Sequence, residues 1–411
     1  MPGPGVRTTT RSHRRRLLVL GAGPAQLGLL EAARARGDVH VIAVDRDPTA
    51  PGLELADERA LVSTEDEPAV ARLAEARRVD GIVSPGADWP VGVAARVAER
   101  MGLPHPLDAR TAALATSKQR QRERFAAAGV PHARALDPDD PALPFPCVVK
   151  APDRQGQRGL ALVGSREGLG RALAAARAEA RGGGVLVEEL VAGPELTVNA
   201  FSVAGAFTAV AVTDRLVAAS PAFGVALAHV WPSTHETSAV VGVARAAVEA
   251  LGIRDGPSYT QLRLGPDGPV VMEVAARLGG GHDAELCRAA TGVDLNSLAI
   301  DAALGTVPER GLSPASRASP AAPPGRAAAI AFLVPPPGRL REVEGVADAE
   351  ALPGVEWVRV YRRPGHAFGP FRRGADRAGA VLATGRDREE ALGRARRAAD
   401  AVRFRVDADA P

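Results

Sequence analysis

Strand-like and helix-like segments alternate over residues 16–110, and this alternation limits the fold more than any other feature of the sequence. Short apolar runs have the length of buried strands, and the segments after them repeat apolar residues at helical spacing. The expected strands cover residues 17–20, 39–44 and 79–84, and the expected helices cover residues 26–36, 68–77 and 91–100. Strands that alternate with helices form a parallel sheet covered by helices. The sequence therefore predicts a doubly wound, Rossmann-like α/β domain.

The turn after the first expected strand has the glycines of a nucleotide-binding loop. It reads GAGPAQLG over residues 21–28, and Asp45 ends the second strand, where a dinucleotide-binding fold uses a carboxylate to hold a ribose. The third glycine of that fingerprint should fall at Gln26, and it does not. We therefore prefer a tight strand-to-helix turn without a cofactor. An NAD(P)-dependent oxidoreductase remains an alternative, which titration with the cofactor would decide.

Two lysines stand apart in a chain that otherwise uses arginine. Of 51 basic residues, only Lys118 and Lys150 are lysine. The two side chains are interchangeable as surface charge, but lysine alone places a compact ammonium among phosphate oxygens. We interpret both lysines as ligands of one polyphosphate.

The expected surroundings of both lysines also favour an anion. Lys150 ends a short strand, and a loop with Gly156 and Gly159 leads from it to a returning strand. Glycines in such a loop let backbone N–H groups converge on an anion. Lys118 is expected in the first turn of a helix that begins at Thr116, where the helix N-terminus attracts negative charge. A solvated hairpin with a lysine at its base is the alternative.

An acidic pair follows in the next expected strand, at residues 185–190. Glu188 and Glu189 stand near its end, and Glu195 comes shortly after. A carboxylate can accept a hydrogen bond from the exocyclic amine of a base, and Glu195 can accept from ribose hydroxyls. Acidic residues at strand ends are ordinary, so this interpretation depends on the lysines.

A hairpin at residues 259–275 predicts a site for a divalent cation. Its loop, residues 266–268, reads Pro-Asp-Gly, which is typical of a three-residue turn. Such a turn sets Gly265 opposite Pro269, and Gln261 then lies opposite Glu273 on the same face. One amide oxygen and one carboxylate, completed by phosphates and water, suit Mg²⁺.

Arg277 follows the hairpin and precedes three consecutive glycines. An arginine at this place can meet the charge of a transferring phosphoryl group. The alternative for the whole region is an ordinary hairpin with a polar face.

Taken in order, these motifs resemble those of the ATP-grasp superfamily. The likeness covers about residues 16–308, and it is closest to carboxylate–amine ligases of the L-amino-acid ligase type. The ATP-binding domains of carbamoyl-phosphate synthetase are also similar, with a glutamine at the position that matches Gln261. The resemblance implies a mixed α/β and α+β protein: a Rossmann-like pre-ATP-grasp domain, a two-subdomain ATP-grasp fold and a small α+β C-terminal domain. The expected ranges are a disordered basic tail (1–15), the pre-ATP-grasp domain (16–112), the ATP-grasp domain (113–308), a Pro/Ser/Ala-rich linker (309–325) and the C-terminal domain (326–411).

The resemblance also implies a role for each motif. ATP and Mg²⁺ (or Mn²⁺) are the implied cofactors, and the glycine loop would close over the phosphates. The implied residues are Lys118, Lys150, Gly156 and Gly159 for the phosphates, Glu188 and the backbone of Val191 for the adenine, Glu195 for the ribose, Gln261 and Glu273 for the metal, and Lys150 and Arg277 for catalysis.

The implied reaction is an ATP-dependent ligation of a small carboxylate to a small amine, through an acyl phosphate, with release of ADP and phosphate. One departure from the family pattern is Ala275, where an asparagine is common after Glu273. That position keeps open a non-catalytic ATP sensor, and a carboxylate-phosphorylating enzyme like carbamoyl-phosphate synthetase is a further alternative. Biotin-dependent carboxylation within one chain is disfavoured, because no further lysine remains to carry biotin.

Composition narrows the class of protein. The net charge of +3 is small for 411 residues, which disfavours a nucleic-acid partner, and no apolar run has the roughly 18 residues of a membrane span. Two cysteines, Cys147 and Cys287, make no disulfide framework, so we expect a reducing, cytoplasmic location. A homodimer is a further expectation.

Overall fold

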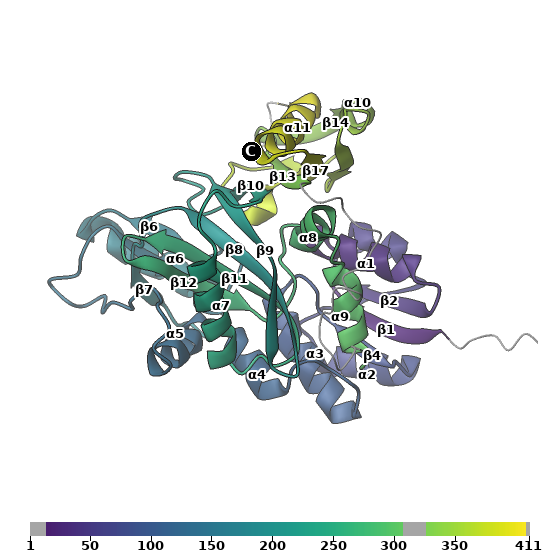
Figure 1. The fold of residues 1–411 in the computed structure, drawn as a ribbon, viewed down its shortest axis with the longest axis horizontal. Helices are drawn as coiled ribbons and strands as arrows, with labels where there is room; N and C mark the ends of the chain where they lie inside the picture. The colour runs from purple at the N-terminus through teal and green to yellow at the C-terminus, as the bar shows by residue number, and fades with distance from the viewer. Residues whose placement is uncertain (1–13, 307–325, 408–411) are drawn as a thin grey trace, which may run out of the picture.

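The computed structural model describes residues 14–306 and 326–407. Its N-terminal part is a parallel sheet of order β3-β2-β1-β4, on the right in Figure 1. The strands are β1 (Arg15–Leu20), β2 (Val39–Asp45), β3 (Glu58–Leu61) and β4 (Gly81–Val83). The helices are α1 (Leu27–Ala35), α2 (Glu67–Arg77) and α3 (Asp88–Met101). The Rossmann-like prediction is confirmed, and β3 is an added strand that the apolar pattern did not indicate.

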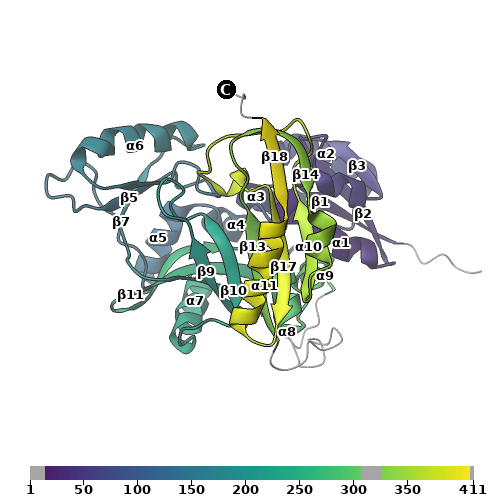
Figure 2. The same ribbon diagram turned by 90° about the horizontal axis from the view of Figure 1, so that it is seen from above.

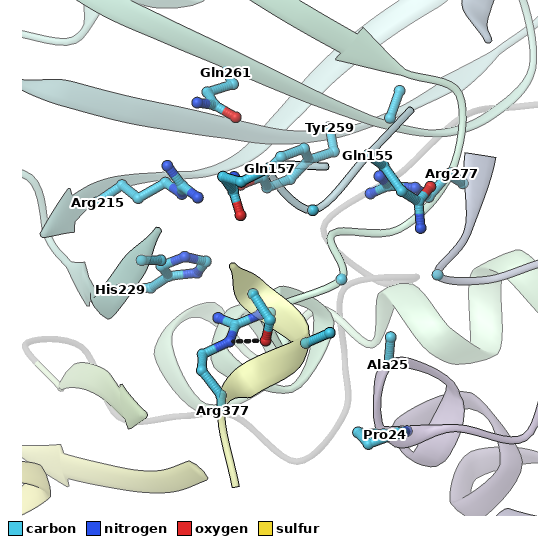
Figure 3. Close-up of a pocket in the computed structure, with 18 of the residues that line it drawn as sticks. Pro24, Ala25, Gln155, Gln157, Arg215, His229, Tyr259, Gln261, Arg277 and Arg377 are labelled. Atoms are coloured by element: carbon cyan, nitrogen blue, oxygen red, sulfur yellow. Dashed lines mark hydrogen bonds between the residues drawn. The ribbon is translucent and has the colours of Figure 1, made fainter. Parts of the chain in front are cut away.

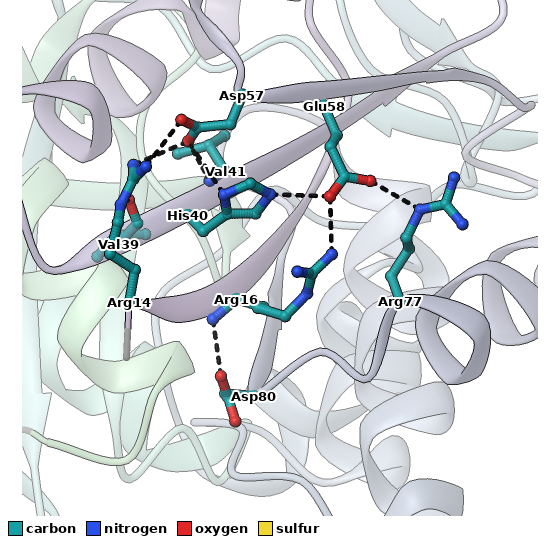
Figure 4. A network of polar contacts seen from close by, with 9 residues as sticks. All are labelled: Arg14, Arg16, Val39, His40, Val41, Asp57, Glu58, Arg77 and Asp80. Atoms are coloured by element: carbon teal, nitrogen blue, oxygen red, sulfur yellow. Dashed lines mark hydrogen bonds and ion pairs between the residues drawn. The ribbon is translucent and has the colours of Figure 1, made fainter. Parts of the chain in front are cut away.

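β3 pairs with β2 in a parallel ladder, and charged side chains flank it where the other strands have buried apolar residues. Glu58 accepts from Arg16, at 2.8 Å, and from Arg77, at 2.7 Å, while Asp57 pairs with Arg14, at 2.9 Å (Figure 4). β1 begins at Arg15, so the last residue of the expected tail is in a strand, and residues 1–13 lie outside the described part of the chain.

The turn at residues 21–28 packs closely against other parts of the fold. The carboxylate of Asp45 accepts from the backbone N–H of Ala22, at 2.9 Å. A side chain at Gly28 would come within 2.4 Å of Glu285, which covers this glycine from a later helix. Asp45 therefore serves the turn itself, and Gly28 is needed for close packing.

The second part begins with two helices and a small antiparallel sheet of order β6-β5-β7. The elements are α4 (Ala109–Ala115), α5 (Lys118–Ala127), β5 (Cys147–Lys150), β6 (Ala161–Val163), α6 (Arg166–Glu179) and β7 (Leu186–Glu189). The predicted helix start at Thr116 is wrong by one residue: Ser117 is the N-cap, and its hydroxyl accepts from the N–H of Arg120. Lys118 is thus the first residue of α5, one position nearer its N-terminus than expected.

A large sheet of order β12-β11-β8-β9-β10-β13-β17-β15 joins the middle of the chain to its C-terminal part. β10 pairs with β13 across the expected linker, whose residues lie outside the described part of the chain, so the sheet continues from one expected domain into the next. Its strands are β8 (Glu195–Val203), β9 (Ala206–Val217), β10 (Ala226–Trp231), β11 (Gly256–Gly265), β12 (Gly268–Ala275), β13 (Ala327–Leu333), β15 (Val355–Val360) and β17 (Gly379–Gly385).

Helices cover this sheet and tie it to the N-terminal domain. They are α7 (Ser238–Ala250), α8 (Asp283–Thr291), α9 (Leu295–Ala303), α10 (Val346–Glu350) and α11 (Arg388–Ala401). One buried cluster contains Leu29 and Ala33 of α1 together with Leu295 and Ala299 of α9. α8 and α9 therefore pack against the Rossmann-like domain (Figure 1), and α11 lies on the C-terminal strands β13 and β17 (Figure 2). A second small sheet, β16-β14-β18, completes the fold, with β14 (Gly338–Glu344), β16 (Ala367–Phe368) and β18 (Arg403–Asp407).

Candidate functional site

Three adjoining cavities lie between the small sheet and the large sheet, and the largest of these three also borders the N-terminal domain. Their volumes are about 290, 80 and 70 Å³, and all three are lined by Gln157 and Gln261. We call them the large, the lysine and the hinge cavity. The lysine cavity includes Lys118 and Lys150, the hinge cavity is lined by residues 189–191, and the large cavity reaches the N-terminal and C-terminal parts of the chain.

The two lysines, though 32 positions apart in sequence, line the same cavity. The Nζ atom of Lys118 lies 2.7 Å from the Glu273 carboxylate and donates to the backbone oxygen of Arg154, also at 2.7 Å. Lys150 pairs with Glu188. Their side chains are only 12% and 13% exposed, so both ammonium groups are largely removed from water and compensated by carboxylates.

Glu188 differs from its expected role at the adenine. The side chain is fully buried and bridges Lys150 and Arg122, the latter at 2.5 Å. Burial alone would raise the pKa of Glu188, but the two cations outweigh it and hold the pKa below its ordinary value. Glu188 is therefore an ionised carboxylate that positions Lys150.

The hinge cavity is lined instead by the residues just after Glu188. They are Glu189, Leu190 and Val191, with Leu160, Phe223 and Met272 supplying apolar surface. The backbone oxygen of Val191 accepts from Arg263 at 3.0 Å. A partly apolar slot beside exposed hinge backbone suits a flat base.

Glu195 borders the hinge cavity, but its carboxylate is already engaged. It pairs with Arg215, accepts from the Gln261 amide and lies 3.3 Å from Arg263. The Glu195 side chain is 2% exposed. The sequence alone did not reveal the Arg215 partner, because Arg215 lies on β9, which was not predicted.

The hairpin places Gln261 opposite Glu273, which confirms the predicted pairing, but by a different route. Gly265 pairs with Gly268, so the loop has one residue fewer than expected. The register then shifts between Gln261 and Leu262, because Met272 is an extra residue that forms a β-bulge. The bulge restores the pairing that the shorter loop would have shifted by one residue.

Gln261 and Glu273 offer a donor set that fits a magnesium ion. The Gln261 amide nitrogen donates to Glu195, which leaves the amide oxygen to face a cation. Burial raises the pKa of Glu273, but Lys118 and Arg277 outweigh this effect, so the pKa stays below its ordinary value and the carboxylate is ionised. Ala275 is buried and adds no oxygen, so phosphate and water would have to complete the coordination.

Arg277 lines the large cavity rather than the lysine cavity. Its Nε lies 2.8 Å from Asp88 at the start of α3, and its Nη1 donates to the backbone oxygen of Leu278 at 2.7 Å. Arg277 is therefore fixed from the N-terminal domain, across the cavity from Arg215 and His229 (Figure 3).

The glycine loop borders all three cavities through Gln157. Gly156 and Gly159 have φ angles of +67° and +65°, which glycine adopts at least cost. Gly156 lines the lysine and large cavities, and a side chain at Gly159 would come within 2.8 Å of Ala151. Gln155 accepts from the backbone N–H of Asp88 at 2.5 Å, so the loop touches the N-terminal domain.

Sequence reasoning missed most of the large cavity. Its polar side chains include Arg215, Tyr259, Tyr361 and Arg377, which come from β9, β11 and the C-terminal part. Burial and the Asp283 carboxylate raise the pKa of Tyr259, so this phenol stays a hydrogen-bond donor. No local motif marks these residues, because only the folded sheet brings them together.

Two family models match parts of the chain. A family model described as an ATP-grasp domain matches residues 143–285, and one described as L-amino acid ligase C-terminal domain 2 matches residues 331–407. The chain is 30% identical over 415 residues to a formate-dependent phosphoribosylglycinamide formyltransferase of Burkholderia pseudomallei, covering 94% of this chain and 95% of that one.

Other relatives match more locally or at lower identity. The chain is 27% identical to the uncharacterized protein y4rH of Sinorhizobium fredii, over 92% of this chain and 82% of that one. It is 31% identical to carnosine synthase 1 of Gallus gallus, over 43% of this chain but only 20% of that protein. It also spans about half (48%) of a matched Synechococcus formyltransferase.

Solved structures show the same fold. The L-amino acid ligase of Bacillus licheniformis superimposes with a TM-score of 0.81 at 22% identity, over 96% of this chain and 99% of that one. Phosphoribosylglycinamide synthetase of Anaerococcus prevotii superimposes with a TM-score of 0.75 at 18% identity, over 96% of this chain and 100% of that one. In the described residues, no helix has both the length and the apolar character that crossing a bilayer requires.

Proposed function

Because the chain belongs to the ATP-grasp family, we propose that it is an ATP-dependent carboxylate–amine ligase in which each of the three cavities binds a different part of the substrates. The observation that supports the proposal is that Lys118 and Lys150 line one cavity, which shares Gln157 and Gln261 with both neighbouring cavities. In this assignment the hinge cavity takes the nucleoside, the lysine cavity the phosphates, and the large cavity the acid and the amine.

The phosphates would be held by charge and by backbone. Lys118 and Lys150 neutralise them, and the loop from Gly156 to Gly159 covers them. Glu188 keeps Lys150 extended toward the cavity. Gln261 and Glu273 are the residues that would hold Mg²⁺, which supplies charge neutralisation when bound; Mn²⁺ meets the same oxygen ligands.

The reaction needs positioning more than covalent chemistry by the protein. The substrate carboxylate would lie between the lysine cavity and Arg277 and would accept the γ-phosphoryl group, giving an acyl phosphate and ADP. An amine in the large cavity then attacks the acyl carbon, and phosphate leaves as the amide forms. Arg277, held by Asp88, would stabilise the charge that develops on the acyl phosphate.

A screen for phosphate release tests this function. The full chain is incubated with Mg-ATP and pairs drawn from amino acids, small acids and amines. We expect release of ADP and phosphate that requires both an acid and an amine, with an amide product identified by mass. Binding of Mg-ATP without ADP formation from any pair would instead favour the nucleotide sensor. That alternative rests on Ala275, which replaces the asparagine common at this position.

A further inference from the structure

The two ring nitrogens of His229 have different surroundings. This histidine lies on β10, its side chain is 3% exposed, and it lines the large cavity (Figure 3). Nδ1 lies 2.8 Å from an oxygen of Asp283, which is fully buried. Nε2 is buried and has no hydrogen-bond partner within residues 14–306 and 326–407. An unpaired buried nitrogen costs free energy, so a bound group that pairs with it would be favoured.

Asp283 decides which nitrogen carries the proton. Its carboxylate also accepts from the backbone N–H of Gly281, at 3.2 Å, which fixes its orientation at the start of α8. A carboxylate can only accept, so the neutral His229 ring donates from Nδ1 and keeps a lone pair on Nε2. Phe332 packs edge-on against the ring, with centroids 5.5 Å apart, and restrains its rotation.

His229 lines the large cavity, which the proposed function assigns to the acid and the amine. Arg215 is its cross-strand neighbour, and Arg277 lies across the cavity (Figure 3). The lysine and large cavities share Gln157, Gln261 and Glu273 in their linings, so an acyl phosphate formed in the lysine cavity would lie next to the large cavity. The charged and titratable groups that share the cavity wall with His229 are Arg215, Tyr259, Glu273, Arg277, Tyr361, Arg362 and Arg377.

We propose that His229 is the catalytic proton acceptor for the amine substrate and that Asp283 is its positioning residue. This inference rests on the proposed ligase function. The amine loses one proton to solvent as it binds in its neutral form. Its nitrogen then bonds to the acyl carbon, one N–H proton passes to Nε2 of His229, and the C–O bond to phosphate breaks. The phosphate leaves with that electron pair and takes the proton from the imidazolium, so His229 returns to its starting state.

The test separates the two half-reactions. Hydroxylamine captures acyl phosphates as hydroxamates and depends little on a protein base, whereas an alkyl amine needs one. With Mg-ATP and the acid from the screen, His229→Gln should lower amide formation by about 10²-fold or more while hydroxamate formation stays unchanged. Asp283→Asn should lower amide formation by about 10-fold, again with hydroxamate spared. His235→Gln, outside the three cavities, is the matched control and should alter neither product.

Each outcome has a definite meaning. Equal loss of amide and hydroxamate in folded His229→Gln would assign the residue to binding or structure and overturn the proposal, as would full retention of amide formation. If His229→Gln does not fold, an unchanged amide-to-hydroxamate ratio in Asp283→Asn overturns it. Absence of hydroxamate from the wild-type chain with every acid would instead reject the ligase function itself.

Discussion

At the scale of single residues, we expect the substitution Lys150→Ala to impair phosphoryl transfer much more than folding. Lys150→Ala removes the ammonium but leaves Glu188 paired with Arg122, so we expect the free energy of unfolding to fall by only about 1–3 kcal/mol. ATP-dependent phosphate release should fall by about 10²-fold or more, because a charge beside the transferring group is lost. Arg171→Ala, on the exposed face of α6, is the control and should retain activity. ADP formation by Lys150→Ala at the wild-type rate would remove this residue from the site.

Glu285 makes the fold sensitive to acid. Burial would raise its pKa, but His282 and Arg359 outweigh burial and hold the pKa at about 2, against an ordinary 4.5. Because the pKa is lower in the folded state, ionised Glu285 adds about 3 kcal/mol to the free energy of unfolding. This contribution is complete above about pH 5 and is lost as the pH falls toward about 2. Glu285→Gln should therefore be less stable at neutral pH and show a flatter dependence over that range. Urea unfolding at a series of pH values measures both effects.

The lysines were identifiable from the sequence because their type is informative in an arginine-rich chain. Glu188 was identifiable as a polar residue at a strand end, but its ion-pair partner Arg122 could not be predicted. Its pairing with Arg122 joins α5 to β7, 66 positions apart, and no local pattern encodes that contact. Likewise, Arg215 and His229 become neighbours only because β9 and β10 pair.

At the scale of elements, the hinge between β7 and β8 depends on Gly193. Its φ is +116°, and a side chain there would come within 1.9 Å of the backbone oxygen of Leu264. Gly193→Ala should lower the free energy of unfolding by about 1–3 kcal/mol and raise the KM for ATP, because the hinge lines the expected nucleoside cavity. Gly170→Ala is the matched control in helix α6, where a side chain meets nothing within 4 Å. It should stabilise by about 0.5–1 kcal/mol, as measured by urea unfolding. Equal effects from both substitutions would contradict the hinge argument.

Elements with strong apolar periodicity were predicted well, and those without it were not. The expected strands and helices of residues 16–110 differ from the observed ones mainly at their ends. β3 was missed because its sequence, ERAL, has no buried apolar run, and β9, β10 and α7 to α9 were not assigned from sequence. The pairing of Gln261 with Glu273 was right for a partly wrong reason, since neither the shorter loop nor the Met272 bulge was foreseen.

At the scale of the whole molecule, the small sheet is held toward the N-terminal domain by Arg181. This residue pairs with Glu65, at 2.5 Å, and its guanidinium lies over the Trp89 ring at 4.3 Å. Arg181→Ala should loosen that contact, raise the KM for ATP by about 2- to 10-fold and increase amide hydrogen exchange over residues 152–185. Arg166→Ala, whose contact with Asp140 stays within the small subdomain, is the control. Exchange that is unchanged by Arg181→Ala would show that other contacts hold the subdomains together.

The C-terminal part, in contrast, is fixed to the middle of the chain by strand pairing within the continuous eight-stranded sheet. Because β13 pairs with β10, Arg377 and Tyr361 are set against the large cavity by backbone hydrogen bonds rather than by a movable domain contact. The composition of residues 309–325 indicated a linker, but nothing in it indicated that the sheet resumes beyond.

The pairing of Lys118 with Glu273 has a consequence for how the enzyme would be loaded. Glu273 now pairs with Lys118 at 2.7 Å, with Arg277 and Lys150 as further cations nearby. In the proposed site, an incoming triphosphate would compete with Glu273 for Lys118, and a divalent ion that arrives with the nucleotide would give the carboxylate a replacement cation. We therefore expect the metal complex of the nucleotide to bind more tightly than the free nucleotide.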